Sequence, residues 1–309
     1  MTIAYLGPAG TFTESALRQI EPDAARHQPV ASVPAALSAV RGGRAESAVV
    51  PIENSVEGGV TATLDALAAG AELRIRAEML VPIRFALVSL RPKELSEVRA
   101  VSTHSHAWAQ VRGWVDENMR EVEYIPASST AAGALGLLAS GDQAGYDAAI
   151  CSPAIVAAHP ELAVLADDIG DNRAAVTRFV HVAEPGSPLP ERTGSDRTTL
   201  VIPLWTDRAG ALLEILEQFA TRGVNLSRIE SRPTGNSLGE YFFSVDLDGH
   251  ILDERVAEAV MGLRRICPTT RFLGSYPKAE TGLADVESRH TDGAFRQARD
   301  WVQELRAGR

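Results

Sequence analysis

The sequence is poor in cysteine and contains no long apolar run. Its 309 residues include two cysteines, Cys151 and Cys267, which lie far apart in apolar surroundings, outside any CxxC pair and without a histidine at metal-ligand spacing. This pattern argues against a disulfide framework or a zinc site and predicts buried thiols in a reducing compartment. No run approaches membrane-spanning length, and the first residues, MTIAYL, lack the basic start of a signal peptide. We therefore expect a cytoplasmic protein.

Basic residues are scarce relative to acidic ones. Lys and Arg number 30 against 40 Asp and Glu, which gives a formal net charge of −10. Binding to nucleic acid or to an anionic membrane requires a basic face, so neither is an expected partner. An anionic small molecule is compatible with this charge, because a few arginines or a helix N-terminus bind one locally. The length predicts two domains, or a two-lobed domain followed by a smaller one.

Strands and helices alternate through the first part of the chain, in two successive runs. This alternation is typical of α/β lobes with parallel sheets, and ligands of such folds lie in the cleft between lobes. The expected strands are 3–6, 47–52, 73–80, 85–89, 98–103, 122–125 and 148–151, and the expected helices are 11–20, 33–40, 61–67, 108–115 and 130–139.

Polar side chains gather where several of these elements meet. Thr11 opens a helix after a Gly-rich turn, where free N–H groups suit an anion. The strand at 47–52 runs into two carboxylates, an amide and a hydroxyl within 53–57, and Thr103-His104 precedes a helix. A further loop enters a strand at 172–182, placing Thr177, Arg178 and Phe179 at its mouth. Taken alone, each cluster favours an interpretation as ordinary loop and strand residues.

Residues 184–196 contain three prolines and two glycines without apolar periodicity, which predicts a linker. Beyond it, strands at 198–204, 224–231, 241–247 and 270–276 and helices at 209–221 and 253–266 follow the order βαββαβ. This order predicts a four-stranded antiparallel sheet with helices on one face, whose open edge favours pairing with a second copy. A last helix at 292–305 has an apolar stripe that suits docking on the body or on a partner subunit.

Five stretches in register carry a family resemblance. They are YLGPAGTFT at 5–13, VPIENSVEG at 50–58, Thr103-His104 with Gln110, Asn172 with Thr177-Arg178-Phe179, and the pair GAL at 210–212 and IESRP at 229–233. In this order the chain resembles the monofunctional prephenate dehydratases along nearly its whole length, and its C-terminal unit resembles an ACT domain, a small amino-acid-sensing module. One loop departs from the family pattern: where Ser-His-Pro-Gln-Ala-Leu is usual, this chain has Thr-His-Ser-His-Ala-Trp at 103–108, and Val111 replaces the usual cysteine.

The resemblance implies an enzyme that converts prephenate to phenylpyruvate with loss of water and carbon dioxide, without a cofactor or metal, in phenylalanine biosynthesis. The implied fold is α/β: a periplasmic-binding-protein-like catalytic domain at 1–183 (lobe one about 1–80 and 168–183, lobe two about 81–167), a linker at 184–196, a ferredoxin-like ACT domain at 197–278, and an extension at 279–309 with a helix. Phenylalanine is the implied allosteric effector, and a homodimer or homotetramer is expected through the ACT domains.

Roles follow from the resemblance and from the chemistry of a departing hydroxyl. Thr177 is the implied essential threonine, expected to hydrogen-bond the leaving oxygen, with Glu53 or His104 as the proton source. The expected substrate-binding residues are Thr11, Asn54, Ser55, Gln110, Arg178 and Phe179. The expected phenylalanine site, near the turn from Asp207 to Gly210, comprises Gly210, Ala211, Leu212, Asn225, Leu226, Glu230 and Ser231.

Two alternatives stay open. Arogenate dehydratase differs by a substrate amino group in place of a keto group, and no residue decides between the two substrates. A non-catalytic amino-acid sensor would need no reactive groups in the first cleft, whereas Glu53, His104 and Thr177 are all present. Their presence favours the enzyme.

Overall fold

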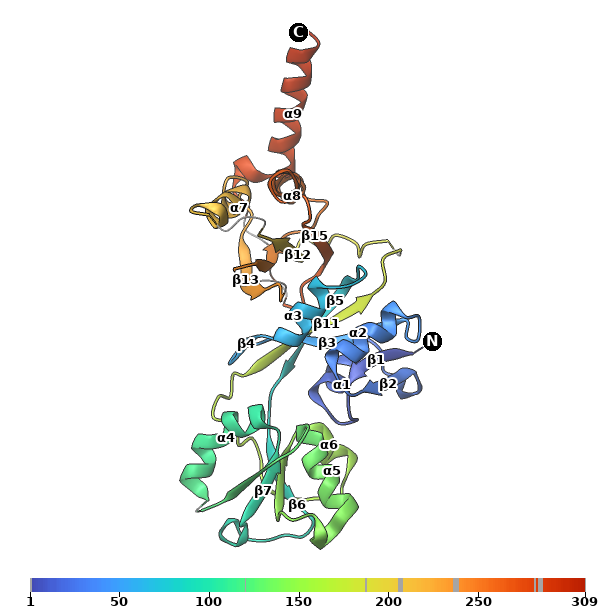
Figure 1. Ribbon diagram of the computed structural model, residues 1–309, viewed down its shortest axis with the longest axis vertical. Helices are drawn as coiled ribbons and strands as arrows, with labels where there is room; N and C mark the ends of the chain where they lie inside the picture. The colour runs from blue at the N-terminus through green and yellow to red at the C-terminus, as the bar shows by residue number, and fades with distance from the viewer. Residues whose placement is uncertain are drawn as a thin grey trace. The chain divides into compact units, whose positions relative to one another are not determined.

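The computed structural model describes residues 2–119, 121–186, 188–204, 208–235, 239–280, 282 and 286–308 (Figure 1). The chain forms two compact units, one of residues 1–60 and 79–179, the other of residues 61–78 and 180–309. The predicted fold class is confirmed, since two α/β sheets precede a βαββαβ unit. Within the described residues, no helix is both long and apolar enough to cross a membrane.

The first sheet places the end of β3 beside the start of β11. Its strand order is β2-β1-β3-β11-β5, with β4 paired to β3, and β1 is parallel to both of its neighbours. The division between the two units falls inside β5 and β11. The strands are β1 (Ile3–Leu6), β2 (His27–Val30), β3 (Ser47–Asn54), β4 (Gly58–Gly59), β5 (Arg74–Pro82) and β11 (Val176–Ala183), and the helices among them are α1 (Phe12–Leu17), η1 (Ala24–Arg26), α2 (Val33–Arg41) and α3 (Thr61–Ala68).

The second sheet has the order β10-β6-β9-β7-β8 and is covered on both faces. Successive residues of β6 and β9 belong to different cores, as strand alternation requires. Leu87 and Ile150 pack with α4, whereas Val88 and Cys151 pack with α5. The elements are β6 (Ala86–Ser89), η2 (Leu95–Glu97), β7 (Ala100–Thr103), α4 (Ser105–Asn118), β8 (Glu123–Pro126), α5 (Thr130–Ser140), η3 (Gly141–Gln143), β9 (Ala148–Cys151), α6 (Pro153–Ala158) and β10 (Ala163–Ala166).

Several of these short elements were not expected from the sequence, among them β2, β10 and α6. β2 carries Pro29 and lies at the edge of its sheet, where a missing N–H is tolerated. β10 is a four-residue antiparallel edge strand, and α6 spans six residues. Each is too short for its periodicity to stand out. The helix expected at 11–20 is shorter than its apolar pattern and ends at Leu17.

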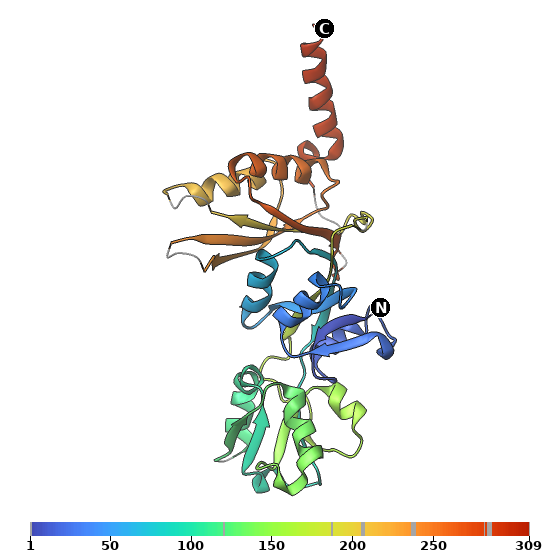
Figure 2. The ribbon, with the colours of Figure 1, turned by 45° about the vertical axis from the view of Figure 1, so that its right-hand side comes forward.

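The C-terminal sheet has the predicted antiparallel arrangement, in the order β13-β14-β12-β15. Figure 2 shows α7 and α8 on one of its faces, where Leu200, Ile215, Val245 and Leu263 form the core. The elements are β12 (Asp196–Pro203), which takes in the last residue of the predicted linker, α7 (Ala211–Ala220), β13 (Leu226–Pro233), β14 (Tyr241–Asp248), α8 (Glu254–Ile266) and β15 (Arg271–Pro277).

The other face of this sheet is polar and meets residues 61–78 of the same unit. Arg232 donates to both carboxylate oxygens of Asp65 on α3, at 3.1 and 3.0 Å. Arg197 pairs with Glu78. A Cβ atom at position 274 would lie only 2.3 Å from the carbonyl oxygen of Ile75, so any larger residue than Gly274 would collide with that backbone. Glycine is therefore required where the two backbones approach.

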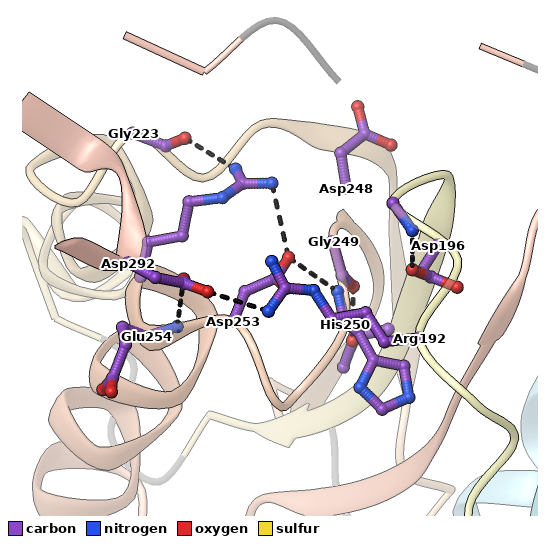
Figure 3. Close-up of polar contacts among 12 residues, drawn as sticks. Arg192, Asp196, Gly223, Asp248, Gly249, His250, Asp253, Glu254 and Asp292 are labelled. Atoms are coloured by element: carbon purple, nitrogen blue, oxygen red, sulfur yellow. Dashed lines mark hydrogen bonds and ion pairs between the residues drawn. The ribbon is translucent and has the colours of Figure 1, made fainter. Parts of the chain in front are cut away.

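An ion-pair cluster holds the last helix, α9 (Asp292–Arg306), against the start of α8 (Figure 3). Arg192 lies between two carboxylates, 2.7 Å from Asp253 and 2.8 Å from Asp292. The second oxygen of Asp292 accepts from the backbone N–H of Glu254 at 3.0 Å. The apolar stripe beyond this anchor is solvent-exposed, with Trp301 60% and Leu305 53% exposed. Among the described residues, therefore, only the first turns of α9 are packed against the rest of the chain.

We predict that Asp292→Asn loosens α9. Burial raises the pKa of Asp292, but hydrogen bonds from Glu254 and Arg192 outweigh it and leave the pKa below its usual 3.8. The anchor is therefore intact above that range and is lost as pH falls through the lowered pKa. Losing the ion pair costs about 1–2 kcal/mol. Amide exchange across 292–306, followed by mass spectrometry at neutral pH, should accelerate roughly 5- to 30-fold.

Asp300→Asn, an exposed carboxylate on the same helix, is the matched control and should exchange like the unmodified chain. Equal exchange in the two variants would contradict an anchoring role for Asp292.

Candidate active site

The ends of β3 and β11 bring together residues that are far apart in sequence. The N–H of Ser55 donates to the carbonyl of Val176 at 2.9 Å, and the Ser55 hydroxyl accepts from the Val176 N–H at 3.0 Å. Ser55 therefore holds the start of β11 through both its backbone and its side chain. This pairing places Glu53 and Asn54 beside Thr177 and Arg178.

Asn54 orients the hydroxyl of Thr177. The amide oxygen of Asn54 accepts from the N–H groups of Val56 and Glu57, at 2.8 and 3.3 Å. Its NH₂ group is thereby directed to Thr177, whose Oγ1 accepts a hydrogen bond of 2.8 Å. Thr177 is buried. Because the hydroxyl is already an acceptor on one side, its own proton is available to another oxygen.

Glu53 and Arg178 form a second pair. The Nε and Nη2 atoms of Arg178 both lie 3.0 Å from Oε2 of Glu53, and the arginine side chain is only 6% exposed. Successive strand residues point to opposite faces of a sheet, so this pair and the Asn54–Thr177 pair lie on different faces. The residues expected to bind a carboxylate and to supply a proton are thus bound to each other. Phe179 is buried in the sheet.

His104 caps the N-terminus of α4, directly after β7. Its Nδ1 accepts from the backbone N–H of His106 at 3.3 Å, which leaves the proton of the neutral ring on Nε2. Burial lowers the pKa of His104, the charge of His106 lowers it further, and Glu57 partly opposes them. At neutral pH the ring is therefore an uncharged hydrogen-bond donor.

Two other residues expected to bind substrate, Gln110 and Thr11, differ in how far their side-chain polar atoms are hydrogen-bonded within the chain. Gln110 lies on α4, and its buried Oε1 is among the side-chain atoms of the described residues that have no hydrogen-bond partner. Thr11, in contrast, is fully engaged: its hydroxyl donates to the carbonyl of Leu6 at 3.0 Å and accepts from the N–H of Glu14 at 3.4 Å.

The Gly-rich turn before α1 binds a carboxylate of its own chain. The N–H of Gly10 donates to Oε2 of Glu14 at 2.5 Å, and Arg18 donates to the other oxygen at 2.6 Å. Burial raises the pKa of Glu14, but these hydrogen bonds prevail and the pKa is lowered. The hydroxyl of Ser152, at the start of α6, donates to the Gly10 carbonyl at 2.7 Å and so links the turn to the second sheet. The N–H of Gly10 is thus already occupied.

A cavity of about 490 Å³ lies at the N-terminus of α7. Gly210 precedes this helix with a left-handed φ of 85°. Asp207, the start of the expected turn, lies outside the described residues. Four of the seven residues expected to bind phenylalanine line the cavity, namely Gly210, Ala211, Leu212 and Ser231. The other six lining residues are Leu204, Arg208, Leu213, Leu216, Tyr241 and Phe243.

The remaining three expected residues do not line it. Asn225 and Leu226 lie at the opposite end of β13 from Ser231, roughly 17 Å along an extended strand. Asn225 donates to Asp248 at 2.7 Å. The expected set is therefore divided between two places.

Sequence reasoning also missed a contact of a residue that it did not assign to the site: the Nδ1 atom of His106 lies 3.1 Å from Oε2 of Glu57. Glu57 stands in a family motif and His106 in the loop that departs from one, and no pattern in the sequence pairs them. Across the described part of the chain, no group of three or more His, Cys, Asp or Glu is placed to hold a metal ion. Cys151 and Cys267 are buried and free.

Comparisons with known proteins agree along the chain. Residues 3–187 match the prephenate dehydratase family and residues 199–265 the ACT domain. A prephenate dehydratase of Amycolatopsis methanolica is 43% identical over 307 residues, covering 99% of this chain and 98% of that protein. The crystal structure of prephenate dehydratase in complex with L-Phe from Arthrobacter aurescens has a TM-score of 0.93 and 59% identity, covering 99% of each chain. A structure described as GqqA, a novel type of quorum quenching acylase, has a TM-score of 0.77 and 29% identity, covering 90% and 98%.

We predict that NMR titration of His104 gives a pKa below 6.5, the value of an unperturbed imidazole. Because the unfolded chain takes up this proton first as pH falls, the histidine contributes stability above pH 6.5 that is lost as pH drops toward the lowered pKa. His159, whose ring lies 3.1 Å from Glu161, provides an internal comparison. A His104 pKa at or above 6.5 would contradict the assigned burial of the ring.

Proposed function

The chain belongs to the prephenate dehydratase family, and we propose that it converts prephenate to phenylpyruvate, releasing water and carbon dioxide, in phenylalanine biosynthesis. The reaction makes it a carbon–oxygen lyase. The observation that carries the proposal is the hydrogen bond from Asn54 to Thr177. It turns a hydroxyl at a strand end into a directed donor.

The chemistry of prephenate suits such a donor. Loss of the ring hydroxyl and of one carboxylate creates an aromatic ring, so aromatisation supplies much of the driving force. A threonine hydroxyl is too weak an acid to release its proton, but it stabilises charge that develops on a departing oxygen. A positioned donor of this kind is typically worth about 10² to 10⁴ in rate.

His104 is the second donor in this proposal. Its neutral ring presents Nε2–H, because Nδ1 is occupied by the His106 N–H. Glu53 serves as the ion-pair partner of Arg178, which organises the strand ends. Gln110 has an unpaired amide oxygen, which suits a hydroxyl group of the substrate. The proposal therefore favours hydrogen-bond assistance over transfer of a proton from a strong acid. The electrons of the bond to the departing carbon dioxide complete the aromatic ring and expel the hydroxyl as hydroxide, which the two donors stabilise and which takes a proton from solvent to become water.

Phenylalanine is the proposed effector, bound in the cavity at α7. Leucine and phenylalanine side chains form much of its wall, which suits a phenyl ring, and Gly210 and Ser231 bring polar backbone and hydroxyl groups to its lining. The related protein of A. aurescens was crystallised with L-Phe. We also propose a homodimer or homotetramer formed through this unit. The support is that β13 is an edge strand and that its residue Ile229 is exposed.

The proposal retains the domain division 1–183, 184–196, 197–278 and 279–309, which the family matches at 3–187 and 199–265 support. Cytoplasmic location, as for other biosynthetic enzymes of this kind, belongs to the same proposal. Turnover of prephenate and of arogenate by the purified protein, with and without phenylalanine, tests substrate choice and regulation together.

We predict that Thr177→Ala lowers kcat for prephenate by about 10² to 10⁴, while Thr177→Ser retains most activity. Asn54→Asp should lower kcat toward the alanine level, because an aspartate oxygen would accept the Thr177 proton instead of donating to its oxygen. The aspartate still accepts from Val56 and Glu57, so the loop is preserved. Asn118→Asp, an exposed amide at the end of α4, should be unaffected. Normal turnover in Thr177→Ala would remove this hydroxyl from the chemistry.

We predict that Leu213→Asp weakens phenylalanine binding about tenfold, which corresponds to ~1.4 kcal/mol, because it replaces an apolar wall by a charge facing the ligand. Leu213 is 58% exposed in the described chain, so folding should be retained. Leu252→Asp, a 65% exposed leucine outside the cavity, is the matched control. Calorimetric titration with phenylalanine measures both, and an unchanged affinity in Leu213→Asp would place the effector elsewhere.

A further inference from the structure

His106 stands where the family pattern has glutamine, and the mechanism proposed above gives its side chain no role. It is the second residue of α4 and is 66% exposed, yet it makes three specific contacts. Its backbone N–H donates to Nδ1 of His104 at 3.3 Å. Its ring meets the His104 ring edge-on, with centroids 4.9 Å apart and planes at 80°. Its Nδ1 lies 3.1 Å from Oε2 of Glu57.

Glu57 belongs to the loop that orients Thr177. The N–H of Glu57 donates to the amide oxygen of Asn54 at 3.3 Å, and the NH₂ group of Asn54 donates to Thr177 at 2.8 Å. One residue thus contributes its backbone to the Thr177 side of the site and its carboxylate to the His104 side.

These contacts form one continuous polar chain between the two candidate catalytic groups. It runs from Thr177 through Asn54 to Glu57, and from Glu57 through His106 to His104. The link between Glu57 and His106 is the point where a loop of the first sheet meets a helix of the second. All of these residues belong to the same compact unit.

We propose that His106 is a positioning residue, which through Glu57 sets the spacing of Thr177 and His104 and through its backbone and ring sets the tautomer and orientation of His104. The inference rests on the proposed function for its catalytic consequence. A contact between two exposed side chains contributes little to stability, so its effect lies in geometry. Misplacement of reacting groups by about an ångström costs up to roughly 10²-fold in rate.

The electrostatics of the pair give the proposal a signed test. The groups whose charge acts on the pKa of His104 are His106, which lowers it, and Glu57, which raises it. Removing the two charges one at a time must therefore move the pKa of His104 in opposite directions. A purely structural disturbance would move it in the same direction in both variants, by exposing the ring.

The experiment compares His106→Gln, Glu57→Gln and the double variant. Glutamine at 106 keeps the backbone N–H that caps His104. NMR titration should show the His104 pKa rising in His106→Gln and falling in Glu57→Gln. The kcat/KM for prephenate should fall about tenfold in each single variant. In the double variant, kcat/KM should fall no further than in the more impaired of the two single variants.

His159→Gln is the matched control, because His159 and Glu161 form another histidine–glutamate pair at 3.1 Å in the second sheet's lobe; it should leave both readouts unchanged. Shifts of the same sign, no shifts, or independent losses in the double variant would overturn the proposal. If the unmodified chain shows no turnover of prephenate, the proposed function fails while the NMR titration still decides whether His106 and Glu57 control His104.

Discussion

The site depends on the pairing of β11 with β3. Thr177 and Asn54 are separated by 123 positions in sequence, yet a single hydrogen bond of 2.8 Å joins them. The chain passes through the whole second sheet before it returns, so the hydroxyl is positioned by long-range strand pairing rather than by local turn geometry. The Ser55 contacts to Val176 fix the register at this point. A slip of one residue would exchange the faces and present Arg178 to Asn54 instead.

Charged pairs elsewhere in the molecule play an organising part rather than an energetic one. Arg228 and Asp246 are both buried in the C-terminal sheet, with two hydrogen bonds of 2.9 and 3.1 Å between them, and Thr199 adds a third to Asp246 at 2.7 Å. Burying such a pair carries a desolvation cost that its attraction only partly offsets, so it contributes specificity more than stability. Arginines of the same face bind two carboxylates of segment 61–78, Arg232 pairing with Asp65 and Arg197 with Glu78.

Periodicity was sufficient for most of the fold, because each long element buries one face. The alternating residues of β6 pack into two different cores on the two faces of their sheet, and the apolar stripe of α8 packs into the core of the C-terminal sheet. Periodicity did not find β2 or α6, whose few residues satisfy no repeat. The site was predictable as a set of loops but not as contacts. Glu53 and Arg178 were assigned separate tasks from their chemistry, and only strand register pairs them. The N–H groups near Thr11 were expected to be free for an anion, and the carboxylate of Glu14 occupies the neighbouring N–H of Gly10.

The loop between β3 and β4 explains how so few residues connect both candidate catalytic groups. Gly58 adopts a left-handed φ of 82°, which lets the chain reverse and pair Asn54 with Gly58 and Glu53 with Gly59. The three residues between the strands are therefore held at both ends. Within this closed turn the backbone N–H of Glu57 must face the Asn54 amide, and its side chain is left pointing outward to His106. A longer or open loop would allow one contact without the other, whereas this turn makes the two contacts depend on each other.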